Sequence, residues 1–267
     1  MIGQKKLLSI IDRQLFENSF PRFSIIIGKR GSEKDKIGVY ISKYLGANCV
    51  NTSDIKVDNI RTIIQESYKV SSITVYNITN ADSMSIQAQN SLLKVTEEPP
   101  NKAYFVMALE DENNTLPTIR SRGSIYHCDE YTQEELVNYA SEKYGTFKYC
   151  GICDTPGEID LLHEMKEEEF YNYVEKVVDN ISTVSGSNAF KIADKIALKD
   201  EDDKYDLRLF WKAFKSLCVD EMSGDDPIKY GRAIAITGDS LHELSFKGIN
   251  KTELFDIWLL NIRSEWL

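Results

Sequence analysis

The segment that decides the fold reads Phe23-Ser-Ile-Ile-Ile-Gly-Lys-Arg-Gly-Ser-Glu-Lys-Asp35. Its first five residues are apolar apart from one serine, which is typical of a strand buried on both faces of a sheet. A loop with two glycines follows, and the apolar spacing of residues 34–45 then predicts a helix with one buried face. Strand, loop and helix in this order form the repeating unit of parallel α/β sheets.

The same alternation of strand and helix patterns continues through the first half of the chain. Further strands are predicted at residues 48–51, 72–76, 103–109 and 124–128. A helix with an apolar stripe is predicted at residues 58–68, between the second and third strands. We therefore expect residues 1–130 to form an α/β domain, with a parallel sheet covered by helices.

Helical patterns occupy the second half of the chain. Thr132-Gln-Glu-Glu135 has the spacing of a capping box, in which the first and last side chains each satisfy a free backbone amide at a helix start. With a short helix predicted at residues 158–165, this box indicates a small helical lid over residues 131–165. Five longer helices are predicted at residues 167–182, 187–199, 204–222, 226–243 and 251–265. They would make residues 166–267 an all-helical C-terminal domain, whose last helix has a start signal in Asn250 and Glu253.

The composition is that of an ordinary globular protein. The chain has 267 residues, 42% of them apolar, and no uninterrupted apolar run long enough to cross a bilayer. Because no apolar signal core follows the N-terminus, we expect a cytoplasmic protein without membrane contacts. Five cysteines do not make a disulfide framework, and Cys150 and Cys153 lack the second pair of ligands that a tetrahedral zinc site needs. No bound metal is expected.

Negative charge is concentrated in the second half of the chain. Residues 1–150 hold 18 Lys and Arg and 18 Asp and Glu, so the remaining residues carry the whole net charge of −10. With an isoelectric point near 5.0, the chain is a poor ligand for a phosphate backbone. This charge argues against a stand-alone DNA-binding protein and favours a solvated or protein-contacting surface.

Residues 28–35 follow the phosphate-loop pattern Gly-x-x-x-x-Gly-Lys-Ser/Thr with two departures. Gly28, Gly31 and Lys34 are in place, but the second required glycine is Glu33 and the hydroxyl residue is Asp35. A side chain at position 33 crowds the amides that bind phosphate, and both carboxylates repel it. At an effective dielectric constant of about 20, two like charges about 4 Å apart repel by roughly 4 kcal/mol, or roughly a thousandfold in affinity. The loop is therefore predicted not to bind ATP, although the carboxylate of Asp35 could still hold Mg²⁺.

Two other runs are intact and carry a family resemblance. They are Gln87-Ala-Gln-Asn-Ser-Leu-Leu-Lys-Val-Thr-Glu-Glu-Pro-Pro100 and Leu116-Pro-Thr-Ile-Arg-Ser-Arg122. Together with the altered loop they resemble the clamp-loader branch of the AAA+ ATPases, and within it the delta-prime type of subunit. The resemblance covers roughly residues 1–165 and implies an AAA+ phosphate-loop domain followed by a helical lid. Beyond these residues, the helical character and the length of the chain are similar to the oligomerising collar of the family.

The resemblance also implies that other ATPase positions are altered. The acidic pair that holds magnesium and polarises water in active relatives falls on Thr79 and Asn80. The polar residue expected near the end of the next strand falls on Leu109, and a second phosphate-sensing arginine falls at Glu158. Because phosphoryl transfer needs metal, phosphate clamp and positioned water together, the resemblance implies a chain that does not hydrolyse ATP by itself.

Ser121 and Arg122 are the residues to which the resemblance gives a catalytic role. In the family, this arginine enters the ATP site of a neighbouring subunit, where a guanidinium binds γ-phosphate oxygens bidentately and stabilises the transition state. The alternative is a local ion pair between Arg122 and an acid such as Asp129. Gln89 falls where relatives couple DNA contact to the ATP site, which implies a coupling role for it.

The resemblance thus implies a non-hydrolysing, delta-prime-type clamp-loader subunit of a DNA polymerase III complex. The implied partners are a gamma/tau-type ATPase subunit and a delta subunit, with the sliding clamp and primed DNA reached through the complex. No cofactor and no small-molecule substrate are expected. Two alternatives remain, an ATP-binding gamma/tau-type subunit of the same family and an unrelated phosphate-loop NTPase.

Overall fold

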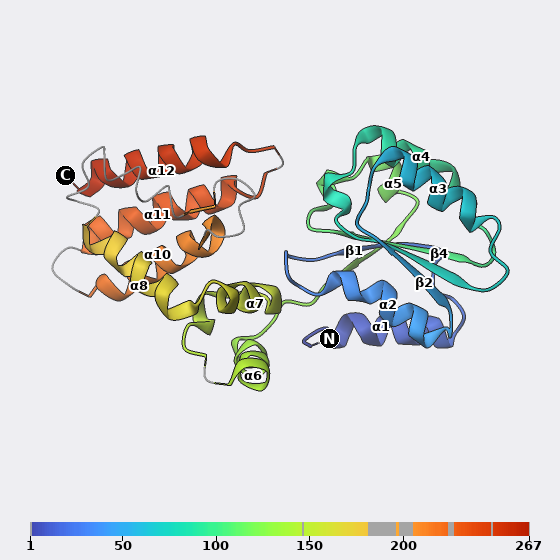
Figure 1. The fold of residues 1–267 in the computed structure, drawn as a ribbon, viewed down its shortest axis with the longest axis horizontal. Coiled ribbons are helices and arrows are strands. Elements are labelled where there is room, and N and C mark those ends of the chain that lie inside the picture. The colour runs from blue at the N-terminus through green and yellow to red at the C-terminus, as the bar shows by residue number, and fades with distance from the viewer. Residues whose placement is uncertain are drawn as a thin grey trace. The chain divides into compact units, whose positions relative to one another are not determined.

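The computed structural model describes residues 2–145, 147–180, 196–197, 205–223, 227–246 and 248–266. Contacts along the chain divide it into two compact units, each with its own core (Figure 1). The first unit contains residues 1–146 and 154–157, and the second contains residues 147–153 and 158–267. The assignment of residues 131–165 to a lid and of residues 166–267 to a collar stays a prediction.

A five-stranded parallel sheet forms the centre of the first unit (Figure 1). Its strands are β1 (Phe23–Ile27), β2 (Asn48–Thr52), β3 (Thr74–Ile78), β4 (Ala103–Leu109) and β5 (Ser124–His127), in the order β2-β3-β4-β1-β5. Every residue of β1 and β3 is buried, as the continuous apolar runs predict for strands covered on both faces. The predicted α/β fold class, with a helical C-terminal region, is confirmed.

Helices cover both faces of this sheet (Figure 1). On one face lie α1 (Lys5–Phe16) and α2 (Ile37–Tyr44), and on the other lie α3 (Val57–Ser67), α4 (Ile86–Glu97) and α5 (Pro117–Arg120). Because side chains alternate along a strand, Ile26 packs into the core of α1 and α2, whereas Ile25 and Ile27 pack into the core of α3, α4 and α5.

Short helical turns and one further helix connect these elements. The single turns are η1 (Lys34–Lys36), η2 (Ala81–Ser83), η3 (Glu112–Asn114) and η4 (Cys150–Ile152). Helix α6 (Gln133–Tyr144) begins at the predicted capping box, since Thr132 Oγ1 accepts from the Glu135 amide and Glu135 Oε2 accepts from the Thr132 amide. The predicted box is confirmed.

Two predicted elements of the first unit differ from those observed, and one observed helix was not predicted. The helix expected at residues 34–45 begins as the turn η1, because Glu33 before it is left-handed at φ 60°, and regular helix starts only with α2. The strand expected at residues 72–76 lies two residues later, in register with β2 and β4. Helix α1 was not predicted, although Leu7, Ile11 and Leu15 mark its buried face at four-residue spacing.

Helices make up most of the described part of the second unit. They are α7 (Pro156–Glu164, whose first two residues belong to the first unit), α8 (Glu167–Asn180), α10 (Leu207–Glu221), α11 (Pro227–Glu243) and α12 (Lys251–Trp266). The core of α10 and α12 is aromatic, because Phe210, Phe214 and Phe255 surround the fully buried indole of Trp258. Asn250 caps α12 by accepting from the amides of Thr252 and Glu253, as its start signal predicts.

Two of the helices predicted in the second half of the chain differ from the structure. Residues 196–197 form a short strand, β6, against β7 (Tyr205–Asp206), so the helix predicted at 187–199 is wrong there, and its other residues lie outside those described. The helix predicted at 204–222 starts only at Leu207. Asp206 is its N-cap, with a carboxylate that accepts from the Leu209 amide at 3.0 Å. No helix in the described ranges is long and apolar enough to span a bilayer.

Thr237→Val is expected to destabilise the second unit more than its small change in shape suggests. The buried Thr237 hydroxyl accepts from the Trp258 indole nitrogen at 3.0 Å and donates to the Ala233 carbonyl at 2.8 Å. Valine leaves the indole N–H without an acceptor, which costs about 1–3 kcal/mol. Urea unfolding followed by tryptophan fluorescence measures this loss, and Thr237→Ser, which keeps the hydroxyl, is the control. Equal stability of the valine and serine variants would contradict the role of this hydrogen bond.

Candidate functional site

The parallel sheet places the altered phosphate loop and Arg122 at opposite edges. The loop follows Ile27 at the carboxyl end of β1, whereas Arg122 precedes Ser124 at the amino end of β5. Ser24 pairs with Ser124 in the sheet register, so about four residues of strand, or roughly 13 Å, separate the two sites along β1. Arg122 therefore lies away from the phosphate loop of its own chain.

The phosphate loop keeps the backbone shape that the glycine pattern demands. Gly31 and Glu33 both have left-handed backbones, at φ 78° and φ 60°. A side chain in this region costs about 1–2 kcal/mol, so Glu33 occupies, under strain, a conformation that suits glycine. Its carboxylate accepts from the Ile2 amide at 3.2 Å and forms an ion pair with Lys36. These contacts offset part of the predicted repulsion of phosphate, while the bulk of the side chain stays at the glycine position.

The lysine of the loop is also engaged. Lys34 is buried, and its ammonium donates to the Lys29 carbonyl at 3.4 Å. Asp35 is exposed, and its carbonyl accepts from the side-chain amide of Asn77 at 2.7 Å. In the structure, the lysine that would clamp a phosphate is therefore directed to the backbone of its own loop.

Two other segments of the first unit bind the loop through its carbonyl groups. Thr155 donates from its hydroxyl to the Arg30 carbonyl at 2.9 Å, and the Gly157 amide donates to the Gly31 carbonyl at 3.0 Å. A Cβ atom at Gly157 would lie 2.5 Å from the Cα of Gly31, so the two backbones touch. The hydroxyl of Tyr131 donates to the Ser32 carbonyl at 2.8 Å. These contacts hold the loop closed on its own chain.

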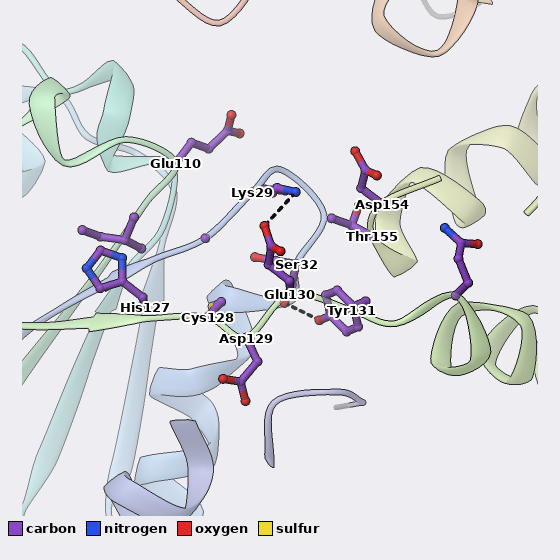
Figure 2. A pocket seen from close by; sticks show the side chains of 13 residues that line it. Lys29, Ser32, Glu110, His127, Cys128, Asp129, Glu130, Tyr131, Asp154 and Thr155 are labelled. Carbon is purple, nitrogen blue, oxygen red and sulfur yellow. Dashed lines mark hydrogen bonds and ion pairs between the residues drawn. The ribbon is translucent and has the colours of Figure 1, made fainter. Parts of the chain in front are cut away.

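A pocket of about 310 Å³ lies beside the loop, at the carboxyl edge of the sheet (Figure 2). Acidic side chains dominate its charged lining, with Glu110, Asp129, Glu130 and Asp154 against Lys29. Lys29 Nζ lies 3.3 Å from Glu130 Oε1, and Figure 2 shows the two side chains facing each other. Asp129 turns away from the pocket, where its carboxylate accepts from the amide of Lys6 at 2.8 Å at the start of α1. With Lys29 paired to Glu130, the acids Glu110 and Asp154 leave the lining negative, which disfavours a triphosphate.

Two other groups of this pocket are held in their neutral forms. Burial raises the pKa of the Cys128 thiol, so the sulfur is protonated at neutral pH and is a poor nucleophile. Burial likewise raises the pKa of the Tyr131 phenol, which keeps the proton that it donates to Ser32. The pocket therefore offers no activated nucleophile at either position.

The residues at the remaining ATPase positions are not suited to bind magnesium or phosphate. Thr79 donates its hydroxyl to the Thr52 carbonyl at 3.2 Å, and Asn80 has a left-handed backbone at φ 56°. Leu109 is fully buried. In the second unit, both carboxylate oxygens of Glu158 lie 2.7 Å from the ammonium of Lys212. Neither a magnesium ligand pair nor a sensing arginine stands at these predicted positions.

Arg122 forms a local ion pair, but its partner is Glu97 and not Asp129. Its Nε and Nη2 lie 2.8 and 2.6 Å from Glu97 Oε1, and its Nη1 donates to the Thr118 carbonyl at 2.6 Å. Asp129 is wrong as a partner because its carboxylate is bound to the amides that start α1. The guanidinium side chain is still one-third exposed at the sheet edge.

The turn around Arg122 packs tightly against the sheet. Ser121 donates its hydroxyl to the Thr118 carbonyl at 3.1 Å. A Cβ atom at Gly123 would lie 2.8 Å from ring or methyl carbons of Phe23 and Ile25 in β1. Glycine at position 123 therefore lets this turn approach the buried strand.

Gln89 ties helix α4 to the segment that precedes this turn. The side chain is buried, and its amide nitrogen donates to the carbonyls of Met84 and Asn114 at 3.2 and 3.0 Å. Its Oε1 accepts from the Leu116 amide at 2.8 Å. The contacts fix the start of α5 on α4, which is compatible with the predicted coupling role but does not involve DNA.

Several residues at these sites were not foreseen from the sequence. Glu97 and Thr118 bind Arg122, while Gln4 pairs with both backbone groups of Asp129, at 3.1 and 2.7 Å. No local pattern marks Glu97 or Gln4, because their contacts join segments 25 and 125 residues apart, whereas Thr118 lies only four residues before Arg122. In the described parts of the chain, no three His, Cys, Asp or Glu side chains are grouped to hold a metal ion. The five cysteines all lie within the described residues and form no disulfide bond.

Gln89→Leu is expected to destabilise the first unit by about 2–4 kcal/mol. Leucine preserves most of the volume but leaves the Leu116 amide and two carbonyls without their partner, at about 1–3 kcal/mol for each group that stays buried. Thermal unfolding measures the loss, and Gln87→Leu, at an exposed position of the same helix, is the control. Equal melting temperatures for the two variants would show that Gln89 does not hold α4 to α5.

Part of the chain is similar in sequence to known proteins. Residues 13–132 match the family described as DNA polymerase III, delta subunit. The gamma subunit of DNA polymerase III from Buchnera aphidicola of Schizaphis graminum is 26% identical over 169 residues, which cover 52% of this chain and 47% of that protein. The delta-prime subunit from Escherichia coli K12 is 26% identical over 117 residues, which cover 43% of this chain and 35% of that protein. The delta-prime subunit from Buchnera aphidicola of Baizongia pistaciae is 31% identical over 144 residues, covering 50% and 43%. The matched regions thus span less than half the length of these relatives.

Solved structures are similar to this chain in fold. A gamma subunit-related protein of DNA polymerase III from Thermotoga maritima superposes with a TM-score of 0.52 at 18% identity, covering 99% of this chain and all of that one. The RuvB Holliday junction branch migration motor of the same organism gives a TM-score of 0.51 at 17% identity, covering 97% and 87%. The sequence matches support a clamp-loader family member, similar to the delta-prime and gamma subunits of DNA polymerase III, whereas the solved structures show the fold alone.

Proposed function

We propose that this chain is a delta-prime-type subunit that does not hydrolyse ATP and lends Arg122 to the ATP site of a neighbouring subunit. The observation that carries the proposal is the placement of Arg122 at the amino edge of the sheet, opposite the phosphate loop of the same chain. A side chain at that edge is available to a second subunit but not to the loop after β1. This separation supports the supply of the arginine in trans.

The chemistry of Arg122 suits such a role. A guanidinium carries a permanent positive charge and several N–H donors in one plane, which match the oxygens of a γ-phosphate. Charge builds up on these oxygens during phosphoryl transfer, so a cation placed there lowers the barrier. Ser121 precedes Arg122 and stabilises the turn through its bond to Thr118. We assign the catalytic contact to Arg122 and a supporting role to Ser121.

The state of the phosphate loop supports the non-hydrolysing part of the proposal. Glu33 stands at the glycine position, Lys34 is turned to the loop backbone, and Gly157 touches Gly31. ATP would have to displace these contacts and enter beside an acidic pocket. Each of these features opposes the binding of ATP, so together they disfavour it more strongly.

The proposed partners follow from this assignment. They are a gamma/tau-type ATPase subunit, which receives Arg122, and a delta subunit, with the sliding clamp and primed DNA bound by the assembled complex in the cytoplasm. The excess of acidic residues after residue 150 suits contacts with protein better than contacts with DNA. In this proposal, residues 131–165 serve as a lid and residues 166–267 as the collar that joins the subunits.

The competing assignment is an ATP-binding gamma/tau-type subunit. One of the relatives described above is a gamma subunit, and the loop retains Gly28, Gly31 and Lys34. Nucleotide binding by the isolated chain separates the two assignments.

Calorimetry with Mg-ATP on the purified chain is expected to show no saturable binding below about 1 mM. The closed loop and the acidic pocket leave no cradle for the triphosphate. A gamma-type clamp-loader ATPase run in parallel serves as the positive control. Saturable binding at micromolar concentrations would contradict the proposal and favour the gamma/tau-type assignment.

Arg122→Ala is expected to slow ATP hydrolysis at the adjacent site by roughly 10³-fold, since arginine fingers contribute about 10³–10⁵ in rate. The measurement uses reconstituted loaders in which only that adjacent ATP site is active, with clamp and primed DNA present. Arg13→Ala is the control, because Arg13 is an exposed arginine that also pairs with a nearby glutamate, Glu17, at 3.0 Å. An unchanged rate in the Arg122→Ala loader would refute the supply of arginine in trans.

A further inference from the structure

We propose that Glu97 is a positioning residue for Arg122, which sets the guanidinium for the neighbouring ATP site before the subunits meet. This inference rests on the proposed function and adds to it a second residue of the same chain. Glu97 Oε1 lies 2.8 Å from Arg122 Nε and 2.6 Å from Nη2, while the Thr118 carbonyl accepts from Nη1 at 2.6 Å. Three nitrogens of one side chain are thereby fixed by two acceptors.

The bonding leaves donors for a phosphate. Arginine has five N–H groups, one on Nε and two on each terminal nitrogen. Glu97 accepts from Nε and forms an ion pair with Nη2, and Thr118 accepts from one N–H of Nη1. One N–H on Nη1 and one on Nη2 therefore have no partner among the residues that the structure describes. A phosphate can bind both terminal nitrogens while Glu97 keeps its own contact.

Rigid elements hold the two acceptors in place. Glu97 is the last residue of α4, whose Leu92 and Val95 are fully buried against the sheet. Thr118 lies in α5 beside the fully buried Ile119. Gln89 joins the two helices through its bonds to Asn114 and Leu116. The frame around Arg122 is thus part of the core, although the side chain itself is one-third exposed.

Preorganisation gives this contact a functional consequence. A free arginine side chain populates many rotamers, and fixing them at the moment of phosphate binding opposes that binding. Glu97 and Thr118 select one orientation in advance, so less freedom is lost when the γ-phosphate is engaged. Glu97 is half exposed, and ion pairs at such positions contribute little to folding stability. Removal of Glu97 is therefore expected to slow ATP hydrolysis at the neighbouring site without lowering the folding stability of this chain.

The central experiment compares Glu97→Ala with Glu98→Ala in reconstituted loaders whose only active ATP site is the one that receives Arg122. Glu98 is the matched control because it is the next residue, is exposed and carries the same charge. We expect Glu97→Ala to lower kcat about tenfold with KM for ATP unchanged, and Glu98→Ala to leave both unchanged. Glu97→Gln keeps an oxygen acceptor and is expected to recover most of the rate. The unfolding midpoints of all three variants are expected to equal that of the parent chain.

A second comparison separates this inference from the proposed function. In the Arg122→Ala background, Glu97→Ala is expected to change nothing further, because the residue that it positions is gone. Loss of rate with Arg122→Ala but not with Glu97→Ala would overturn the positioning role and leave the proposed function standing. No loss with Arg122→Ala would overturn both. A rate that rises in Glu97→Ala, or that falls equally with and without Arg122, would also overturn the positioning role.

Discussion

Parallel pairing of β1 with both β4 and β5 determines where the functional groups of this chain lie. In a parallel sheet, all strands start at one edge and end at the other, so a loop after one strand and a turn before its neighbour cannot meet. The phosphate loop follows β1 and the Arg122 turn precedes β5, with Ser24 opposite Ser124 in the register. The two sites would need a second copy of the fold, or a related subunit, to come together. This placement supports the proposal that Arg122 serves a neighbouring subunit and not the loop of its own chain.

The two edges of the sheet differ in how their functional groups are bonded. At the carboxyl edge, side chains and backbone groups of residues 131–157 take up the carbonyls of the loop, and Glu33 keeps a backbone shape suited to glycine. At the amino edge, the contacts of Glu97, Thr118 and Gln89 hold the Arg122 turn without covering it. One edge is closed by internal hydrogen bonds, whereas the other presents an oriented cation. This contrast is the physical basis of our proposal that the chain aids hydrolysis at a neighbouring subunit without hydrolysing ATP itself.

The sequence predicted the sheet well because buried parallel strands leave a strong signal. The strands at residues 23–27 and 103–109 were predicted to the residue, since both are continuous apolar runs. Elements whose position depends on distant partners were predicted less well. The third strand is shifted to Thr74 by its register with β2 and β4, and Asp206 starts α10 later than the apolar pattern suggests. Helix α1 has a clear four-residue spacing and could have been found from it.

The candidate site shows the same division. The departures from the phosphate-loop pattern were readable from the sequence, because that pattern is local. Its closure by Thr155 and Gly157 was not, since these residues come about 125 positions later. Likewise, the motif that contains Arg122 was recognisable from the sequence. Its partner Glu97 was not, because Glu97 lies 25 residues earlier in the chain and no local pattern links the two residues. Local motifs therefore located the groups, and only the tertiary structure showed which contacts each of them makes.

The most direct test of a chain that donates an arginine but holds no nucleotide uses an ATP analogue with a photoreactive group on its γ-phosphate. The analogue is bound to a loader assembled from this chain and its ATPase subunits, illuminated, and the labelled peptides are identified by mass spectrometry. Labelling of this chain is expected only in the peptide that contains Ser121 and Arg122. Labelling of residues 28–35 instead would show that the chain holds the triphosphate in its own loop, and would contradict the division of roles proposed for its two edges.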